Sequence, residues 1–177
     1  MKRRIYLIAS FILLIAVTGF GESLAPLMRD IGLVPLGEGT KYIDFELPDL
    51  KGGSLKLNSF EGKVVFLNFF ATWCGPCKAE MPSMQKLYEK LKPEGFEILA
   101  VDLQESPAVV EAFVKRYGLT FPVVLDRSGQ IGAYYGARSI LTSYIIDRSG
   151  NVIAGAVGSR DWFSPSSIEF FRKVLSQ

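Results

Sequence analysis

The sequence predicts one α/β domain, with a central sheet and helices on both of its faces. Apolar runs typical of strands alternate with helical patterns along the chain. The run Val64 to Phe70 is broken only by Asn68, as expected for a central strand buried on both faces. The two cysteines of the chain, at 74 and 77, directly follow this run and precede a helical pattern. A chain of 177 residues is long enough for one such domain with additional segments.

The N-terminus carries a basic and then an apolar segment. Lys2 to Arg4 precede an uncharged stretch from Ile5 to Phe20, which is typical of a signal peptide or a membrane anchor. Because no clear small-residue cleavage site follows, we favour an uncleaved anchor over residues 1–21; cleavage would instead release a secreted soluble form. Basic residues stay on the cytoplasmic side, so the domain is expected outside the cell membrane, on its periplasmic or outer face.

Charge argues against nucleic acid as a partner. The formal net charge is +2, and the three basic residues near the N-terminus contribute +3, so the rest of the chain sums to −1. A near-neutral domain lacks the basic surface that phosphate backbones require.

The remaining chain divides into a linker and a domain. Residues 22–40 contain Gly and Pro without a sustained period and are interpreted as a linker, and the domain is assigned to residues 41–177. Asp44 to Leu47 and Ser54 to Leu57 flank a Gly-rich turn, which predicts an N-terminal β-hairpin. Further strands are expected at residues 96–101, 121–125, 144–146 and 152–157.

Helices are expected after the cysteines and after two Ser-Pro pairs. Ser106-Pro107 and Ser164-Pro165 each place a capping residue before a proline, and Gly118 suits the end of the first of these helices. After the cysteines, apolar residues recur at helical spacing up to Pro93, and Pro82 is expected to kink that helix.

The cysteine pair is interpreted as a redox-active dithiol. Cys74 would lie at the N-terminus of a helix, where unpaired N–H groups and the positive end of the dipole favour a thiolate, with Cys77 one turn further on. A zinc site needs four ligands, and the chain has no histidine and no third cysteine, so only a metal shared between two chains remains. A purely structural disulfide here would close too short a loop to constrain the unfolded chain.

The segment from Lys63 to Pro82 resembles the active-site segment of membrane-tethered thioredoxin-like proteins of the TlpA/ResA type. The resemblance extends from about Tyr42 to the last helix and includes the segments Phe121 to Asp126 and Tyr144 to Gly150. It implies a thioredoxin-like fold, with a central mixed β-sheet flanked by helices and an added N-terminal hairpin.

The resemblance also implies an activity: thiol–disulfide exchange outside the cytoplasm, in which Cys74 attacks and Cys77 resolves. The protein would reduce a disulfide of a partner protein, for example apocytochrome c during cytochrome c maturation. An upstream membrane thiol reductant would re-reduce the dithiol. We expect a monomer that needs neither a cofactor nor a metal.

The reaction needs a group that takes a proton from the second thiol. Cytosolic thioredoxins use an aspartate on the preceding strand, and Asn68 stands at that position here and cannot ionise. Glu80 lies in helical register with the apolar residues of its helix, so we expect it to be partly buried, with a raised pKa. The alternative is a solvated glutamate paired with Lys78 or Lys86.

The surface around the dithiol is expected to bind the partner. Trp73 is predicted to cover the dithiol and, with Gly75 and Pro76, to bind the partner, or alternatively to serve only in packing. Thr72 and Pro76 are expected to shape the turn. Pro76 removes an N–H from the first helical turn, which favours a reducing poise.

Across the groove, thioredoxin-like proteins place a cis-proline, and here Leu141 stands at that position. The Ile140–Leu141 peptide is therefore either trans, which we favour, with a reshaped groove, or cis and strained. Ile140, Leu141 and Thr142 are the expected substrate-binding residues of this loop.

Two other functions remain open: a disulfide-forming oxidant or isomerase, and a non-catalytic tether that binds thiols or metal, which the altered Leu141 makes more credible. Peroxiredoxin chemistry is disfavoured because Ala71 occupies the position three before Cys74, where a threonine is required.

Overall fold

The computed structural model describes residues 20–37, 39–137 and 140–177. The proposed anchor lies almost entirely outside these residues. Within the described part of the chain, no helix combines the length and the apolar character needed to cross a membrane.

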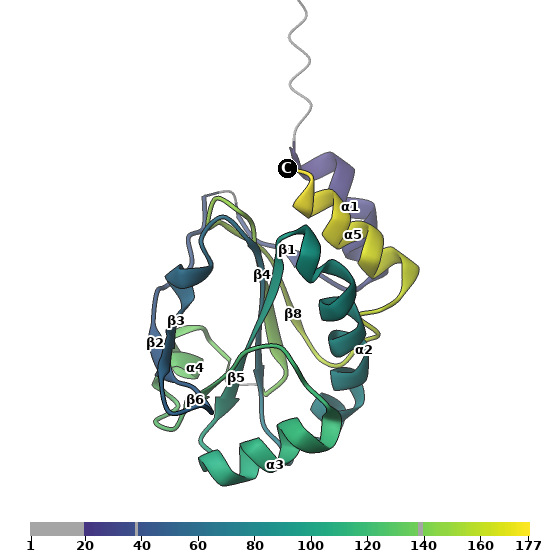
Figure 1. The fold of residues 1–177 in the computed structure, drawn as a ribbon. Helices are drawn as coiled ribbons and strands as arrows, with labels where there is room; N and C mark the ends of the chain where they lie inside the picture. The colour runs from purple at the N-terminus through teal and green to yellow at the C-terminus, as the bar shows by residue number, and fades with distance from the viewer. Residues whose placement is uncertain (1–19, 38, 138–139) are drawn as a thin grey trace, which may run out of the picture.

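The core of the fold is a six-stranded mixed sheet with the order β1-β8-β7-β4-β5-β6 (Figure 1). β4, β5 and β6 run parallel to one another, whereas β7, β8 and β1 continue the sheet in antiparallel pairs. The strand bounds are Val34–Pro35 (β1), Val64–Phe70 (β4), Phe96–Leu103 (β5), Val123–Asp126 (β6), Thr142–Ile146 (β7) and Val152–Val157 (β8).

β4 is the central strand, as predicted. It pairs with β5 on one side and with β7 on the other, and all seven of its residues are buried. Its apolar side chains therefore enter the hydrophobic cores on both faces of the sheet. Because β4 ends directly before the cysteines, this buried strand fixes where the dithiol lies.

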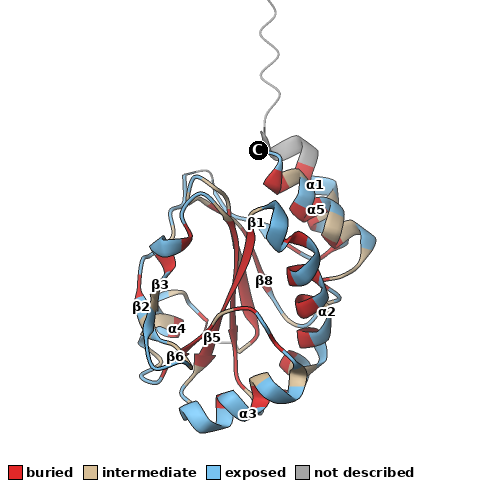
Figure 2. Ribbon diagram, viewed as in Figure 1, coloured by how far each residue is buried: buried red, intermediate tan, exposed pale blue. Residues whose placement is uncertain are grey.

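Four helices cover one face of the sheet (Figure 1). They are α1 (Phe20–Asp30), α2 (Gly75–Leu91), α3 (Pro107–Tyr117) and α5 (Pro165–Leu175). Figure 2 shows that their buried residues lie on the sides that face the sheet. The helix after the cysteines stays continuous through Pro82 and passes into a short 3₁₀ turn, Lys92–Glu94.

The opposite face carries the predicted hairpin, a 3₁₀ turn at Leu57–Phe60 and the short helix α4 (Gln130–Tyr134). The hairpin consists of β2 (Glu46–Pro48) and β3 (Ser54–Lys56), paired antiparallel. The Asp49 carboxylate accepts hydrogen bonds from the N–H groups of Lys51 and Gly53 and so holds the turn. The α/β class with helices on both faces is confirmed, although α4 is the only helix described on this second face.

The segment expected to be a linker differs from that expectation. It contains α1 and β1, and both pack on the domain: α1 lies against α5, and β1 pairs with β8 (Figure 1). Leu24, Met28, Ile31 and Leu33 are buried in the core. These apolar residues recur at near-helical spacing and form a stripe that packs on the domain. The Gly and Pro content of the segment therefore does not make it a linker.

The docking of α1 leads to a prediction. Leu24 is almost fully buried, so Leu24→Ala should lower the free energy of unfolding of the full chain by about 2–5 kcal/mol, as for other buried leucines. Urea denaturation measures this change. Leu27→Ala, at a half-buried position on the same helix, is the matched control and should cost less. Equal, small losses for both variants would show that α1 does not dock in solution.

Candidate redox site

The dithiol lies at the N-terminus of α2. Cys74 is the N-cap residue, and its sulfur accepts a hydrogen bond from the Cys77 N–H at 3.2 Å. Cys74 is buried except for a small exposed part, Cys77 is fully buried, and a disulfide joins them. A helix N-terminus concentrates unpaired N–H groups and a partial positive charge, so the Cys74 position favours a thiolate in the reduced protein.

Glu105 holds the loop that precedes the dithiol. The backbone N–H and the hydroxyl of Thr72 donate to the two carboxylate oxygens of Glu105, the hydroxyl at 2.7 Å. Behind this pair, Asp102 at the end of β5 is fully buried and accepts a hydrogen bond from the Glu105 N–H. Burial, and then the adjacent Glu105, raise the pKa of Asp102 to about 8. No pattern in the sequence pointed to Asp102 and Glu105; Glu105 holds the loop that carries Trp73, and Asp102 binds the Glu105 backbone.

Trp73, Gly75 and Pro76 form the surface around Cys74. The Trp73 side chain is 64% exposed, and Gly75 and Pro76 are also exposed. Trp73 is therefore not a packed core residue, which removes the alternative of a role in packing alone. An apolar side chain so exposed beside the dithiol is suited to contact a partner protein.

Glu80 is buried one helical turn after Cys77. It is 1% exposed, and both of its carboxylate oxygens accept hydrogen bonds. The Trp162 indole N–H donates to Oε2 at 2.9 Å, and the Asn68 side-chain amide donates to Oε1 at 3.2 Å. Burial raises the pKa of Glu80 to about 7, although Trp162, Asn68 and Arg160 all favour its ionised form. The alternative of a solvated glutamate paired with a lysine is wrong.

Asn68 does not ionise, but its side-chain amide positions the Glu80 carboxyl, which does. Its amide N–H₂ donates both to Glu80 and, at 3.0 Å, to the Ser143 hydroxyl on β7. Asn68 thereby joins the central strand to α2 and β7 through one buried side chain. Sequence reasoning identified Asn68 only as an unsuitable proton acceptor and missed Trp162 and Ser143. The one signal for Trp162 was its residue type, since a buried indole N–H needs an acceptor.

The Leu141 loop has a reshaped backbone. The Ile140–Leu141 peptide is trans, and Leu141 has a left-handed conformation with φ of 82°. Its N–H donates to the Phe69 carbonyl and its own carbonyl accepts from the Gly158 N–H, both at 3.0 Å. A non-glycine residue in this region costs about 1–3 kcal/mol, which the surrounding contacts must offset.

Of the three residues expected to bind substrate here, Leu141 and Thr142 are buried and Ile140 is partly exposed. Both backbone groups of Leu141 are already engaged inside the domain, so Ile140 is the best placed of these three residues to meet a partner.

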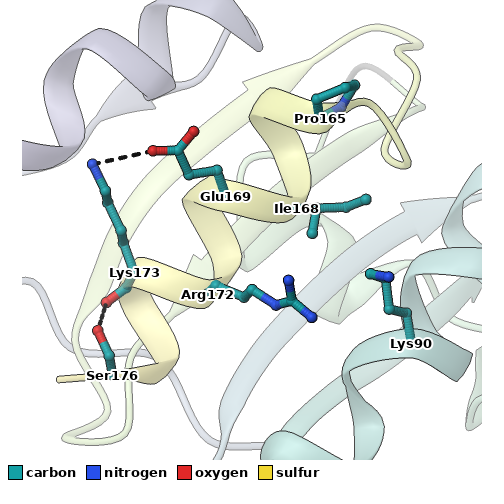
Figure 3. Close-up of a pocket in the computed structure, with 7 residues that line it drawn as sticks. All are labelled: Lys90, Pro165, Ile168, Glu169, Arg172, Lys173 and Ser176. Atoms are coloured by element: carbon teal, nitrogen blue, oxygen red, sulfur yellow. Dashed lines mark hydrogen bonds and ion pairs between the residues drawn. The ribbon is translucent and has the colours of Figure 1, made fainter.

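Pockets on the described surface lie both beside the dithiol and away from it. One of about 310 Å³ adjoins the dithiol loop and is lined by Thr72, Lys78, Ala112, Phe113, Arg116 and Tyr117. Another, of about 570 Å³, lies between α2 and α5 (Figure 3). The residues around it include Arg172 and the ion pair of Glu169 with Lys173, and none of its lining residues is among the hydrogen-bond partners described for Glu80. Among the described residues, no group of three or more potential ligands is arranged to hold a metal ion.

The Leu141 loop gives a prediction about stability. Leu141→Pro removes the N–H that donates to Phe69 and imposes a negative φ where the backbone has a positive one. The free energy of unfolding should fall by at least about 1–3 kcal/mol, the cost of leaving a buried carbonyl without its donor. Leu141→Met keeps the N–H and the apolar volume and should cost less than about 1.5 kcal/mol. A proline variant as stable as the wild type in chemical denaturation would contradict this account of the loop.

Comparison with known proteins identifies the family. The model of the AhpC/TSA family matches residues 39–154. The thiol-disulfide oxidoreductase ResA of Bacillus thuringiensis subsp. konkukian is 45% identical over 122 residues, which are 69% of this chain and 70% of that protein. ResA of Geobacillus kaustophilus is 45% identical over 126 residues, 70% of this chain and 72% of the relative.

Solved structures agree with these relatives. A putative thiol:disulfide interchange protein DsbE from Chlorobium tepidum superimposes with a TM-score of 0.73 at 36% identity, over 79% of this chain and 99% of that one. StoA from Bacillus subtilis superimposes with a TM-score of 0.61 at 27% identity, over 76% and 97% of the two chains. The chain therefore belongs to the AhpC/TSA family and, among its thioredoxin-like members, to the thiol–disulfide oxidoreductases that include ResA.

Proposed function

We propose that this oxidoreductase is a reductant of disulfides in partner proteins and that Glu80 is its proton acceptor. The observation that carries the proposal is the buried Glu80 carboxyl, held by Asn68 and Trp162 one helical turn after Cys77. A carboxyl with a pKa of about 7 can gain and lose a proton near neutral pH, as a general base in this reaction must.

The proposed reaction has two steps. The Cys74 thiolate attacks one sulfur of the partner disulfide, which forms a mixed disulfide and releases the first partner cysteine as a thiolate. Cys77 then gives its proton to Glu80, and the Cys77 thiolate attacks the Cys74 sulfur. This step forms the Cys74–Cys77 disulfide and releases the second partner thiolate. Two electrons pass to the partner, and the Cys74–Cys77 disulfide is the oxidised product.

The proposed location is the extracytoplasmic face of the cell membrane, with an N-terminal anchor. The basic Lys2 to Arg4 and the uncharged stretch that follows them support an anchor whose domain lies outside. The resemblance to TlpA/ResA-type proteins supports the same location. It also supports a partner with a cysteine pair, of which apocytochrome c is the proposed example, and an upstream membrane thiol reductant that renews the dithiol.

Removing the carboxyl should change the pH dependence of exchange. We expect Glu80→Gln to slow reduction of a peptide disulfide and to remove the rise in rate as pH passes through about 7, because the amide cannot accept the Cys77 proton. Stopped-flow exchange rates across the neutral range measure this. Glu89→Gln, an exposed glutamate on the same helix, is the control and should leave the profile unchanged. A Glu80→Gln profile identical to the wild type would remove Glu80 from the mechanism.

The same carboxyl should make stability depend on pH. Its pKa in the folded protein, about 7, lies above the ordinary value of 4.5, so the folded state binds the proton more tightly than the unfolded state. Stability should therefore fall as pH rises from about 4.5 to about 7. Glu80→Gln should make this decline smaller and leave the part caused by Asp102, whose pKa is also raised, as pH-dependent urea denaturation would reveal. A decline of equal size in both proteins would mean that another group causes it.

Trapping and a redox titration test the direction of the reaction. In Cys77→Ser the mixed disulfide cannot be resolved, so Cys74 should remain attached to its partner in membranes of the native cell. Cys74→Ser, which lacks the attacking thiol, is the control and should trap nothing.

The redox titration measures the reduction potential of the Cys74–Cys77 pair. This potential should lie nearer that of thioredoxin, about −270 mV, than that of the oxidant DsbA, about −120 mV. A value near the latter would favour the disulfide-forming alternative.

A further inference from the structure

Arg160, in the loop after β8, binds backbone carbonyls of two distant segments. Its Nη1 donates to the carbonyls of Ile31 and Gly32, at 3.1 and 2.8 Å. Its Nη2 donates to the carbonyls of Val157 and Gly158, at 2.9 and 3.0 Å. Ile31 and Gly32 directly follow α1, so one guanidinium joins the end of the N-terminal helix to the end of a strand of the central sheet.

The same guanidinium lies over the Trp162 ring, 5.1 Å from its centroid. The indole N–H of Trp162 donates to the Glu80 carboxylate, and its backbone N–H donates to the Ser83 hydroxyl at 3.1 Å. That hydroxyl donates in turn to the Glu80 carbonyl. A continuous set of contacts therefore runs from the end of α1 through Arg160 and Trp162 to Glu80.

Arg160 also acts on Glu80 by its charge. It is half-buried, and its charge and its backbone favour the ionised carboxylate, so they hold the pKa of Glu80 below the value that burial alone would set. The side chains that donate hydrogen bonds to this carboxyl, Asn68 and Trp162, are neutral, and among the described residues Arg160 is the charged group that shifts the Glu80 pKa. Cys77 precedes Glu80 by one helical turn on α2. The charged residues that flank these segments, Arg29, Asp30 and Asp161, are exposed to solvent.

We propose that Arg160 is a positioning residue that couples the docking of α1 to Glu80, so that the N-terminal segment sets the pH range of thiol–disulfide exchange. The inference rests on the proposed role of Glu80. The helix α1 and the carbonyls of Ile31 and Gly32 precede the segment that matches the family model. Displacing α1 removes two of the four carbonyl acceptors that hold the guanidinium. Arg160 is then held only by the Val157 and Gly158 carbonyls and the Trp162 ring, so its charge can move away from Glu80 and favour the ionised carboxylate less.

The test is the midpoint of the pH–rate profile for reduction of a peptide disulfide by the full chain. Arg160→Met should raise this midpoint by about 1 unit, the low end of the effect of an opposite charge on a nearby carboxyl. Arg172→Met is the control, because Arg172 pairs with Glu94 and lies in the pocket of Figure 3; it should leave the midpoint unchanged.

Two further variants separate the charge from the link to α1. Arg160→Lys keeps the charge, but three ammonium donors cannot hold four carbonyls, so we expect a smaller upward shift. Met28→Ala weakens the apolar contact of α1 while leaving Arg160 intact, and it should also raise the midpoint. An Arg160→Met protein that folds with the wild-type midpoint overturns the inference. If that protein does not fold, unchanged midpoints in both Arg160→Lys and Met28→Ala overturn it.

A Glu80→Gln background distinguishes failure of this inference from failure of the proposed function. If Glu80→Gln itself leaves the pH profile unchanged, the role of Glu80 fails. If Glu80→Gln removes the pH step but Arg160→Met does not move it, only the coupling through Arg160 fails. The inference expects Arg160→Met to have no further effect on the pH profile once Glu80 is replaced.

Discussion

The buried carboxyl of Glu80 is the constraint on which the site depends. An ionisable group removed from water must be hydrogen-bonded, and this one draws its donors from β4 and from the loop after β8. These donors can reach Glu80 only when β4, α2 and the loop after β8 are packed against one another. Burial also shifts the Glu80 pKa into the neutral range, where thiols and carboxyls exchange protons readily. The same burial therefore links the packing of the fold to the proton chemistry of the dithiol.

Much of this arrangement follows from local sequence patterns. The apolar run of β4, broken only by Asn68, and the cysteines placed after it predicted the centre of the sheet and the position of the dithiol. The helical register of Glu80 predicted its burial, because a residue in line with apolar neighbours faces the core. The hairpin and the Ser164-Pro165 helix start also followed from local rules, and the Ser164 side chain does cap that helix.

The parts that could not be predicted depend on contacts between distant segments. Trp162 and Glu80 are 82 residues apart, and Glu105 reaches Thr72 across 33 residues. No local pattern specifies such pairs. The Gly and Pro content of residues 22–40 wrongly predicted a linker. A short apolar stripe in this segment instead packs α1 against α5, a contact that the local sequence does not reveal. At Leu141, the sequence indicated a loop that differs from that of other thioredoxin-like proteins. Only the structure shows that the Leu141 N–H, a group that proline lacks, donates a hydrogen bond to the Phe69 carbonyl of β4.

The most direct test of the central claim is a carbon-13 NMR titration of the Glu80 side-chain carboxyl in the full chain, assigned by comparison with Glu80→Gln. The buried, hydrogen-bonded carboxyl should show a single titration midpoint near pH 7. A midpoint near the ordinary glutamate value of 4.5 would contradict the proposed role of Glu80, because Glu80 would then be a solvated anion.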